Sequence, residues 1–394
     1  MRLLFIHEVN FVSKVIFEMH EFPELLTLRG HDVTFFHYPE DGGSRSLRTT
    51  RQRITGRAYP TAELTLVTPP TFGGGSLERL AAPLIDLPSL RREIRGGGYD
   101  AIVLYSVPTT GWQTVSIARR AGVPVIYRAL DVSHEIRKTA FTPLIQRAEA
   151  HVYRHATLIS ANNPALGEYC VQVSGREGPV TVDLPPVDLG HFERPAASVR
   201  SRYGLRPEHR VIAYMGSFFS FSGLDDVLLA LRPAFEADPL LRLVLIGGGE
   251  LEPRLRQLCE QHQLDNQVIF TGVVPYAELP AHLAMADVAI NPFRSFQATN
   301  VAFPHKVLQY LASGIPAVST SLRGLRGVLG DAAGVRWADD AAGVAQISLE
   351  MLQLDPVSKA RLSERERSFM NETFSHERAA ESFERTIRSV VSAR

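Results

Sequence analysis

The sequence has few cysteines and no long apolar run. Its two cysteines, Cys170 and Cys259, lie far apart in the chain, which argues against a disulfide framework and indicates a reducing compartment. No apolar run reaches the roughly 18 residues of a membrane-spanning helix. The strand-like residues 3–6 follow Met1-Arg2 at once and leave no room for a signal peptide. We therefore expect a cytoplasmic protein with no transmembrane segment.

The chain also lacks an excess of charge of either sign. Lys+Arg and Asp+Glu both number 42, which argues against a general nucleic-acid binder. No two aspartates are separated by a single residue, and no His/Cys spacing resembles a zinc site. We therefore expect a site that needs neither a metal nor another cofactor. Lysines are scarce and every other basic residue is arginine; the lysines are Lys14, Lys138, Lys306 and Lys359.

A chain of 394 residues that is 45% hydrophobic and 21% charged is expected to form two domains. Short Val/Ile/Leu-rich runs without polar alternation recur between helical patterns, as in parallel strands buried on both faces. The alternation restarts after the Pro- and Asp-rich segment 178–195. We predict two Rossmann-like doubly wound parallel sheets facing across a cleft, in residues 1–185 and 186–374, with a helix at 375–394 packing back towards the first domain.

The expected elements follow from hydrophobic periodicity. Strands are predicted at 3–6, within RGHDVTFF, and at 64–67, 101–105, 123–128, 157–160, 211–215, 242–246, 268–270, 288–291 and 315–318. Helices are predicted at 13–29, 77–95, 110–121, 143–155, 164–173, 223–237, 250–263 and 275–284.

Residues 40–60 are polar and carry five arginines without helical apolar spacing, at Arg45, Arg48, Arg51, Arg53 and Arg57. A solvated loop is one interpretation. An anion-binding lid or a peripheral contact with a membrane surface is the other.

The segment 291–320 carries the most informative pattern. A strand ends at Asn291, and a helix begins near Phe303-Pro304, where proline suits the first turn. Free backbone N–H groups and the positive end of the dipole suit a phosphate at such a helix start. Lys306 lies in that first turn, where a cation opposes the dipole unless an anion compensates it. The alternative is a solvated lysine on an ordinary strand–helix–strand unit.

Other candidates lie where predicted strands end. In the second half these are the loops MGSFFSFSG (215–223), IGGGE (246–250) and 271–274; for the glycines, a tight strand–helix turn is an equal interpretation. In the first half they are His7, Glu8 and Asn10 of HEVNF, Ser106, and the cluster 131–135 with Asp131 and His134. His134 is the leading candidate for a general base because it follows a strand beside two carboxylates.

The order and spacing of several motifs resemble glycosyltransferase family 4, whose members have the two-Rossmann GT-B fold. The motifs are YMGSF, SGLDDVLLAL, LVLIGGGELEPRLRQL, VIFTGVVPYAELPAHLAMADVAINPF and FPHKVLQYLASGIPAVST, over residues 205–320, and FSHERAAESFERTIRSVV at the C-terminal helix. RGHDVTFF, HATLISANNPALGEY and LPPVDLGHF resemble the first domain and the linker. The resemblance implies a nucleotide-sugar diphosphate donor, held mainly by the second domain, and retention of anomeric configuration.

The resemblance also implies roles for individual residues. Lys306 and the helix start would hold the diphosphate with help from Arg294, and Gln309 would bond the ribose. The loop 271–274 would lie near the base, and Thr299 and Asn300 near the sugar. The full donor-binding set is Gly216, Ser217, Gly248, Gly249, Thr271, Val273, Arg294, Thr299, Asn300, Phe303, Pro304, Lys306 and Gln309, and the acceptor side has His7, Glu8, Asn10, Ser106 and Asp131.

The sequence departs from the family pattern at several positions. Ser217 and Ser222 stand where the family often has Arg and Lys, and Val301 and Gln309 stand where many members have two glutamates. We expect a glycosyltransferase that moves a sugar from a UDP- or GDP-sugar to a small-molecule, lipid or glycan acceptor. A GT-B nucleotide-sugar epimerase and a non-catalytic sugar-nucleotide binding protein are the alternatives.

Overall fold

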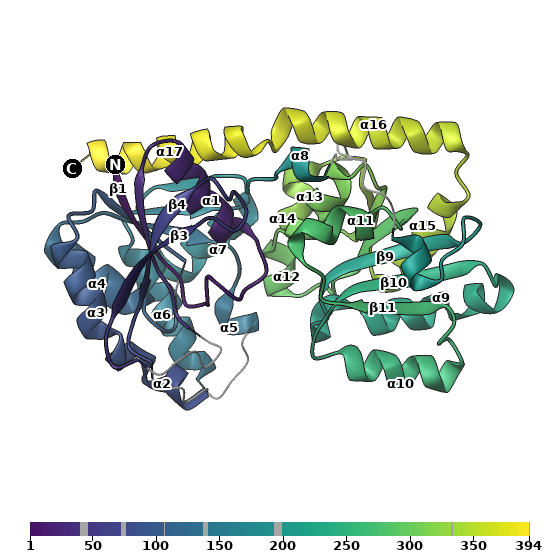
Figure 1. The fold of residues 1–394 in the computed structure, drawn as a ribbon, viewed down its shortest axis with the longest axis horizontal. Helices are drawn as coiled ribbons and strands as arrows, with labels where there is room; N and C mark the ends of the chain where they lie inside the picture. Colours follow the sequence, from purple (N-terminus) through teal and green to yellow (C-terminus); the bar gives the residue numbers. More distant parts are fainter. Residues whose placement is uncertain are drawn as a thin grey trace. The chain divides into compact units, whose positions relative to one another are not determined.

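The structure is a computed structural model that describes residues 1–39, 46–71, 76–105, 107–136, 141–192, 199–331 and 334–393. It divides into two compact units (Figure 1): Met1–Pro186 with His376–Arg394, and Val187–Ser375. The chain therefore passes between the units twice. At these crossings Val187 and Ser375 form an isolated parallel bridge.

Unit 1 is built on an eight-stranded sheet of order β3-β4-β2-β1-β5-β6-β7-β8, parallel except where β3 meets β4. Its strands are β1 (Arg2–Ile6), β2 (Asp32–Phe36), β3 (Thr50–Thr55), β4 (Glu63–Thr68), β5 (Ala101–Leu104), β6 (Val125–Ala129), β7 (Leu158–Ala161) and β8 (Val180–Val182). Its helices are α1 (Glu18–Leu28), α2 (Ser76–Ile85), α3 (Leu87–Gly96), α4 (Gly111–Ala121), α5 (Ser133–Ile136), α6 (Thr142–His155), α7 (Pro164–Ser174) and α17 (His376–Ser392).

At the centre of the sheet of unit 1, residues 3–6 of β1 and all of β5 are apolar because helices cover both faces. Leu3 and Phe5 of β1 join a buried cluster that includes Phe22 of α1 and Phe383 of α17. The rings of Phe22 and Phe383 lie 4.4 Å apart. The last helix of the chain is therefore part of the core of the first unit.

Unit 2 has a six-stranded, wholly parallel sheet of order β11-β10-β9-β12-β13-β14. The strands are β9 (Arg210–Ser217), β10 (Leu241–Gly248), β11 (Val268–Gly272), β12 (Val288–Asn291), β13 (Ala317–Thr320) and β14 (Arg336–Ala338). The helices are α8 (Leu189–Phe192), α9 (Leu224–Ala237), α10 (Glu252–His262), α11 (Leu279–Leu283), α12 (Gln297–Val301), α13 (His305–Ala312), α14 (Arg323–Leu329), α15 (Ala341–Leu352) and α16 (Pro356–Thr373), with short 3₁₀ turns η1 (Arg200–Tyr203), η2 (Ser220–Ser222) and η3 (Tyr276–Glu278). The predicted fold class, two Rossmann-like parallel-sheet domains, is confirmed.

Some predicted elements differ from the structure. The expected helix 13–29 begins only at Glu18, and the expected helix 77–95 is split at Asp86, where Pro88 starts a new helix. In the supposed loop 40–60, residues 50–55 form the antiparallel edge strand β3. That strand was missed because an edge strand exposed on both faces needs no apolar residues.

The arginines of the 40–60 segment that the structure describes are mostly held by other groups. Arg51 pairs with Glu93, Arg53 with Glu63 across the strand pair, and Arg57 donates to the backbone oxygens of Phe11 and Lys14. Arg45 lies outside the described residues. No described helix is both long enough and apolar enough to cross a bilayer.

Candidate functional site

Lys306 lies at the start of α13, at the carboxyl ends of the strands of unit 2. Pro304 is the N-cap of this helix, so Lys306 is its second residue. The ammonium Nζ donates to the hydroxyl of Tyr214 at 2.6 Å. It also lies 4.0 Å from the ring centroid of Tyr214 and 4.4 Å from that of Phe293. Two aromatic faces and one hydroxyl thus surround the charge.

Throughout the described part of the chain, no carboxylate lies within ion-pair distance of Lys306. Burial without a counter-charge lowers the pKa of the Lys306 ammonium well below its usual value. The helix N-terminus adds further positive potential. An anion placed here would satisfy the ammonium and the first backbone N–H groups of α13 together, which is how helix starts bind phosphate.

The glycines at the same edge of the sheet have two different physical roles. A Cβ at Gly216 would lie 3.1 Å from Nζ of Lys306, so a larger residue would displace the ammonium. A Cβ at Gly247 would lie 2.1 Å from the carbonyl oxygen of Gly216, and one at Gly249 would lie 2.7 Å from the backbone nitrogen of Phe218. These two glycines allow one loop to pack on the next, which is the tight-turn interpretation of IGGGE.

Gly248 and the loop 271–273 complete this edge. A Cβ at Gly248 would lie 3.3 Å from Oε2 of Glu252. Thr271 donates its hydroxyl to the carbonyl oxygen of Gly272 at 2.9 Å. The side chain of Val273 is 71% exposed and offers an apolar surface beside the glycines.

The guanidinium of Arg294 is held by two carboxylates of α9. It donates to Asp225 at 2.8 Å and 2.9 Å, to Asp226 at 2.8 Å, and also to the carbonyl oxygen of Ser220. The hydrogen bond to Asp226, and then that to Asp225, raises the pKa of Arg294 further. Its charge is therefore already neutralised by the protein, and it joins the loop after β12 to the start of α9.

Thr299 and Asn300 also bond to neighbouring backbone. The hydroxyl of Thr299 donates to the carbonyl oxygen of Arg294 at 2.6 Å, and the side-chain oxygen of Asn300 accepts from the backbone N–H of Arg323 at 3.1 Å. They hold α12 (Gln297–Val301) and α14 (Arg323–Leu329) in place.

Gln309 lies one turn after Lys306 on α13 and is 8% exposed. Its side-chain amide has no hydrogen-bond partner among the described residues. Phe303 stacks on Phe374 at 6.2 Å. Val301, where a family glutamate would fall, is 1% exposed and belongs to the core. Gln309 therefore retains an unused donor and acceptor near Lys306.

In unit 1, His134 follows β6 and forms a pair with a buried carboxylate. Nδ1 of His134 bonds Oε2 of Glu149, and its backbone N–H donates to Oε1 at 3.2 Å. Burial raises the pKa of Glu149, and the contacts with His134 oppose that shift. With the Nδ1 proton directed at Glu149, Nε2 is left as the basic nitrogen.

The other acceptor-side residues predicted from the sequence have local contacts. The ring of His7 stacks on that of Tyr105 at 5.2 Å, and Glu8 accepts from the backbone N–H of Thr109 at 3.1 Å. Asn10 accepts from the backbone N–H of Val12, and Asp131 accepts from the hydroxyl of Ser133 at 3.4 Å. Ser106 lies outside the described residues.

Sequence reasoning missed three residues that the structure brings into these sites: Tyr214, Phe293 and Glu149. Tyr214 was detectable, because residues 214 and 216 point to the same side of a strand and Gly216 was already a candidate. Glu149 was not, because it lies 15 residues after His134 on a different helix.

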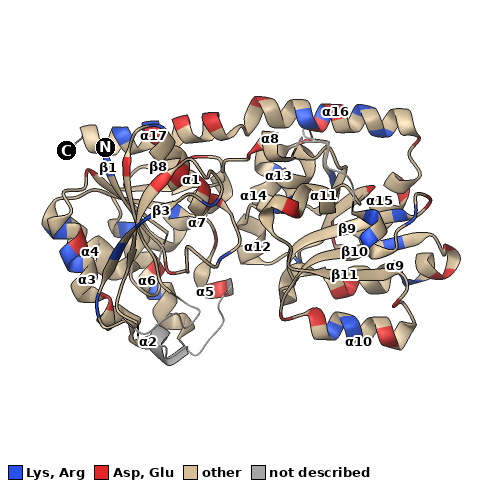
Figure 2. Ribbon diagram, in the orientation of Figure 1, with Lys and Arg blue, Asp and Glu red and all other residues tan. Residues whose placement is uncertain are grey.

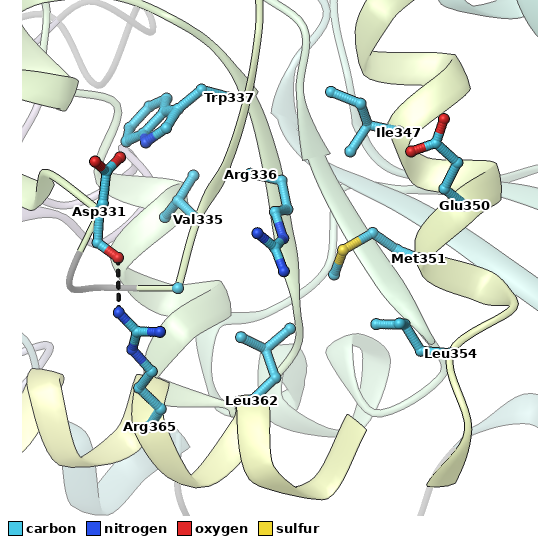
Figure 3. A pocket seen from close by; sticks show the side chains of 11 residues that line it. Asp331, Val335, Arg336, Trp337, Ile347, Glu350, Met351, Leu354, Leu362 and Arg365 are labelled. Atoms are coloured by element: carbon cyan, nitrogen blue, oxygen red, sulfur yellow. Dashed lines mark hydrogen bonds between the residues drawn. The ribbon is translucent and has the colours of Figure 1, made fainter. Parts of the chain in front are cut away.

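A separate pocket of about 510 Å³ lies at the amino end of β14, against α15 and α16 (Figure 3). Val335, Ile347 and Met351 line it, and Arg365 donates to the backbone oxygen of Asp331 at 2.9 Å on one side. It is at the edge of the sheet opposite Lys306 and takes no part in that site. Within the described ranges, no three His, Cys, Asp or Glu side chains are grouped to hold a metal.

Comparison with known proteins places both units in one class. Residues 19–185 match the family model described as "Glycosyl transferase 4-like domain", and residues 209–353 match "Glycosyl transferases group 1". The structure superposes on sucrose-phosphate synthase from Thermosynechococcus elongatus with a TM-score of 0.77 at 16% identity, covering 100% of both chains. It superposes on Anabaena HepE in complex with UDP with a TM-score of 0.73 at 16% identity, covering 99% of this chain and 100% of that one.

A curated relative is the GDP-mannose-dependent alpha-(1-6)-phosphatidylinositol monomannoside mannosyltransferase of Mycolicibacterium smegmatis. It is 34% identical over 116 residues, which are 28% of this chain and 30% of the relative. A second is the D-inositol 3-phosphate glycosyltransferase of Segniliparus rotundus, 30% identical over 155 residues, 37% of this chain and 33% of the relative. The chain thus spans about a third of the length of the curated relatives it matches.

These findings define the class first: the chain carries the two domains of a GT-B glycosyltransferase. Within that class it resembles glycosyltransferase family 4, as the motifs of its second half predicted.

Proposed function

We propose that the protein transfers a sugar from a nucleotide diphosphate sugar to a hydroxyl-bearing acceptor, with retention of anomeric configuration and without a divalent metal. The donor is a UDP- or GDP-sugar, and the acceptor is a small molecule, a lipid or a glycan. A relative is named as GDP-mannose dependent and a structural neighbour was solved with UDP, so both bases are to be tested.

The observation that carries this proposal is the Lys306 ammonium, half-buried between Tyr214 and Phe293 with no carboxylate partner in the described structure. A diphosphate would supply the missing negative charge. As the sugar–phosphate bond breaks, charge grows on the leaving phosphate and the ammonium stabilises it more strongly. This replaces the role that a divalent cation has in many other transferases.

We assign the remaining donor contacts from the positions of residues near Lys306 and at the strand ends of unit 2. Gln309 lies one turn beyond Lys306 with its amide unused and suits the ribose hydroxyls. The exposed Val273 and the glycines at the ends of β10 and β11 suit the flat face of the base. Thr299 and Asn300 shape the loop at the sugar through their backbone bonds.

On the acceptor side, the pair of His134 and Glu149 suits a hydrogen-bond partner for the acceptor hydroxyl. The buried carboxylate of Glu149 holds the imidazole in one orientation through its bond to Nδ1. The leaving phosphate takes up the acceptor proton in the retaining mechanism that the resemblance implies, so His134 would position and polarise the acceptor hydroxyl.

A thermal-shift panel of UDP-, GDP- and dTDP-sugars, with and without EDTA, tests the donor. A ligand present at 100 times its Kd stabilises the folded protein by about 2.7 kcal/mol. We expect one base to raise the melting temperature irrespective of EDTA. Product analysis by NMR then separates transfer with retention from epimerisation, which would turn over donor without acceptor. Binding that requires Mn²⁺ would contradict the proposal.

A further inference from the structure

Three neighbouring helices of unit 1 carry a concentrated positive charge. Helices α3, α4 and α6 contain seven arginines, all exposed: Arg91, Arg92, Arg95, Arg119, Arg120, Arg147 and Arg154 (Figure 2). Because the whole chain has no net charge, such a cationic surface is a local feature and not a result of overall composition.

Within the described part of the chain, no exposed acidic residue lies on these three helices. The same three helices contain two carboxylates, Glu93 and Glu149, and both are buried. Glu93 bonds Arg51 and Tyr99, and Glu149 bonds His134. Of the seven arginines, only Arg154 has a hydrogen bond to another described residue, donating to the carbonyl oxygen of Ser174 at 2.8 Å. The other six guanidinium groups are exposed and have no hydrogen-bond or ion-pair partner among the residues that the structure describes.

The helices form one continuous surface. Helices α3 and α4 contact each other, as do α4 and α6. Trp112 of α4 stacks on His151 of α6 with ring centroids 4.6 Å apart. Gln113 of α4 donates to the carbonyl oxygen of Pro83 in α2 at 3.4 Å, which brings the end of α2 alongside.

Large apolar side chains project from the same surface. Leu84 is 77% exposed, Leu144 56% and Trp112 42%. Leu144 lies two turns before His151 on α6, so it shares the face on which Trp112 stacks. We call Leu84, Trp112 and Leu144, three exposed apolar side chains on helices that adjoin or carry the exposed arginines, the apolar ridge.

We propose that this surface, the arginine face, docks onto a bilayer rich in anionic phospholipid. The guanidinium groups bind headgroup phosphates, and the ridge enters the interfacial layer, where Trp is favoured. A nucleic acid or an acidic protein would use the arginines but leave exposed leucines in water. The proposal is independent of the donor chemistry above and places the protein where a lipid acceptor would be found. In the alternative membrane contact at residues 45–57, Arg51, Arg53 and Arg57 are engaged within unit 1.

Binding to vesicles can be measured by the intrinsic tryptophan fluorescence of the protein. The chain has two tryptophans, and Trp337 lies in unit 2, where its Nε1 donates to the carbonyl oxygen of Gly330 at 3.2 Å. In a Trp337→Phe variant, Trp112 is the only tryptophan. We expect its emission to shift to the blue with phosphatidylglycerol/phosphatidylcholine vesicles, at low salt and without any nucleotide sugar. Pure phosphatidylcholine should give no shift, and about 0.5 M NaCl should reverse it.

The arginines are tested by sedimentation with the same vesicles. One arginine near an anionic surface is worth about fivefold in binding, the equivalent of ~1 kcal/mol. The triple change Arg91→Ala, Arg92→Ala, Arg119→Ala should therefore weaken binding on the order of 100-fold. The matched control replaces Arg232, Arg254 and Arg361, which are exposed arginines of unit 2, and should change it less than twofold.

Three results would overturn the proposal. They are no sedimentation of the wild-type chain with anionic vesicles at low salt, an equal loss in the control triple, and tight binding to double-stranded DNA in the absence of vesicle binding. None of these depends on whether the protein transfers a sugar.

Discussion

At the scale of single residues, the partner of Lys306 in the folded protein is a hydroxyl and not an acid. We predict that Lys306→Ala lowers kcat/KM by about 2–4 kcal/mol, with a loss in kcat as well as in donor affinity, because one preorganised charge is removed from the leaving phosphate. Lys306→Arg should recover only part of this loss. It keeps the positive charge, but the planar guanidinium does not fit the space of an ammonium. Steady-state kinetics with the donor found by thermal shift measures both.

Lys359 provides the matched control. It lies in the same unit on α16, and its Nζ donates to the carbonyl oxygen of Leu352 at 3.2 Å. Lys359→Ala should keep wild-type kinetics. A folded Lys306→Ala protein with wild-type kinetics would show that the start of α13 has only a structural role.

Tyr214→Phe isolates the hydrogen bond to Lys306, because the ring beneath the ammonium is kept. Without the hydroxyl the charged form of Lys306 loses this hydrogen bond, so the pKa of Lys306 should fall further. If the protonated ammonium is needed, activity at high pH is lost earlier, and the alkaline limb of the pH–rate profile moves to lower pH. Tyr203→Phe, whose hydroxyl bonds His282 at 3.1 Å, should leave the profile in place. An unchanged alkaline limb in Tyr214→Phe would show that the hydroxyl does not tune Lys306.

Glu366 of α16 is a buried ionisable group of unit 2. Its side chain is 0% exposed, and neither carboxyl oxygen has a hydrogen bond of normal geometry to a described residue. Burial raises the pKa of Glu366 to about 9, with a smaller opposing effect from the backbone of Ala317. The folded protein thus holds a proton that the unfolded chain releases above its ordinary pKa of 4.5. The contribution of Glu366 to the free energy of unfolding is fully present below pH 4.5 and is lost as the pH rises towards 9.

Glu366→Gln should therefore stabilise unit 2 by about 1–3 kcal/mol at pH 7 and by much less at pH 4, because the amide needs no proton. Thermal melts at both pH values measure this. Glu364→Gln, an exposed change on the same helix, should have little effect at either pH. If Glu366→Gln stabilised the protein equally at pH 4 and pH 7, folding would not raise the pKa of Glu366.

At the scale of elements, α17 is held to the first unit by both polar and aromatic contacts. Asp183 accepts from the hydroxyls of Ser382 at 3.1 Å and Thr386 at 3.0 Å. The guanidinium of Arg128, paired with Glu18, lies 5.6 Å from the ring of Phe383. The helix therefore completes the core and also covers a buried charge network.

Phe383→Ala should cost unit 1 about 3–5 kcal/mol, the usual range for deleting a buried aromatic ring. Because a two-unit chain does not unfold as one transition, hydrogen exchange is the suitable measurement. Amides of β1 and β5 should exchange faster, and those of β9 and β10 should not. Glu381→Ala, exposed on the same helix, is the control. Unchanged protection of β1 in Phe383→Ala would mean that α17 is only a surface attachment.

The elements that could be read from the sequence are those whose burial produces a pattern. Runs such as residues 242–246 are apolar because both faces of the sheet are covered. The edge strand β3 (Thr50–Thr55) is polar on both faces and gives no such signal. Arg294 was assigned to the diphosphate from the family resemblance. Its carboxylate partners lie 68 and 69 residues earlier, so sequence spacing does not reveal these contacts.

At the scale of the whole molecule, the repeat of strand and helix was sufficient to predict two Rossmann-like units, because each half must bury its own sheet. The candidate site was only partly predictable. Lys306, Gly216 and Gln309 lie in motifs with characteristic spacing, whereas Phe293 and Glu149 enter through contacts made after folding.

The composition of unit 1 from residues 1–186 and 376–394 has a consequence for synthesis. The apolar surface of α1 and β1 that receives Phe383 leaves the ribosome long before Phe383 exists. At 5–20 residues per second, making residues 187–375 takes about 10–40 s. During that interval the first domain lacks α17, so the apolar surface of α1 and β1 stays uncovered. The second domain can therefore complete its fold before the first. Nascent chains arrested shortly after residue 186 should therefore be the species that chaperones bind.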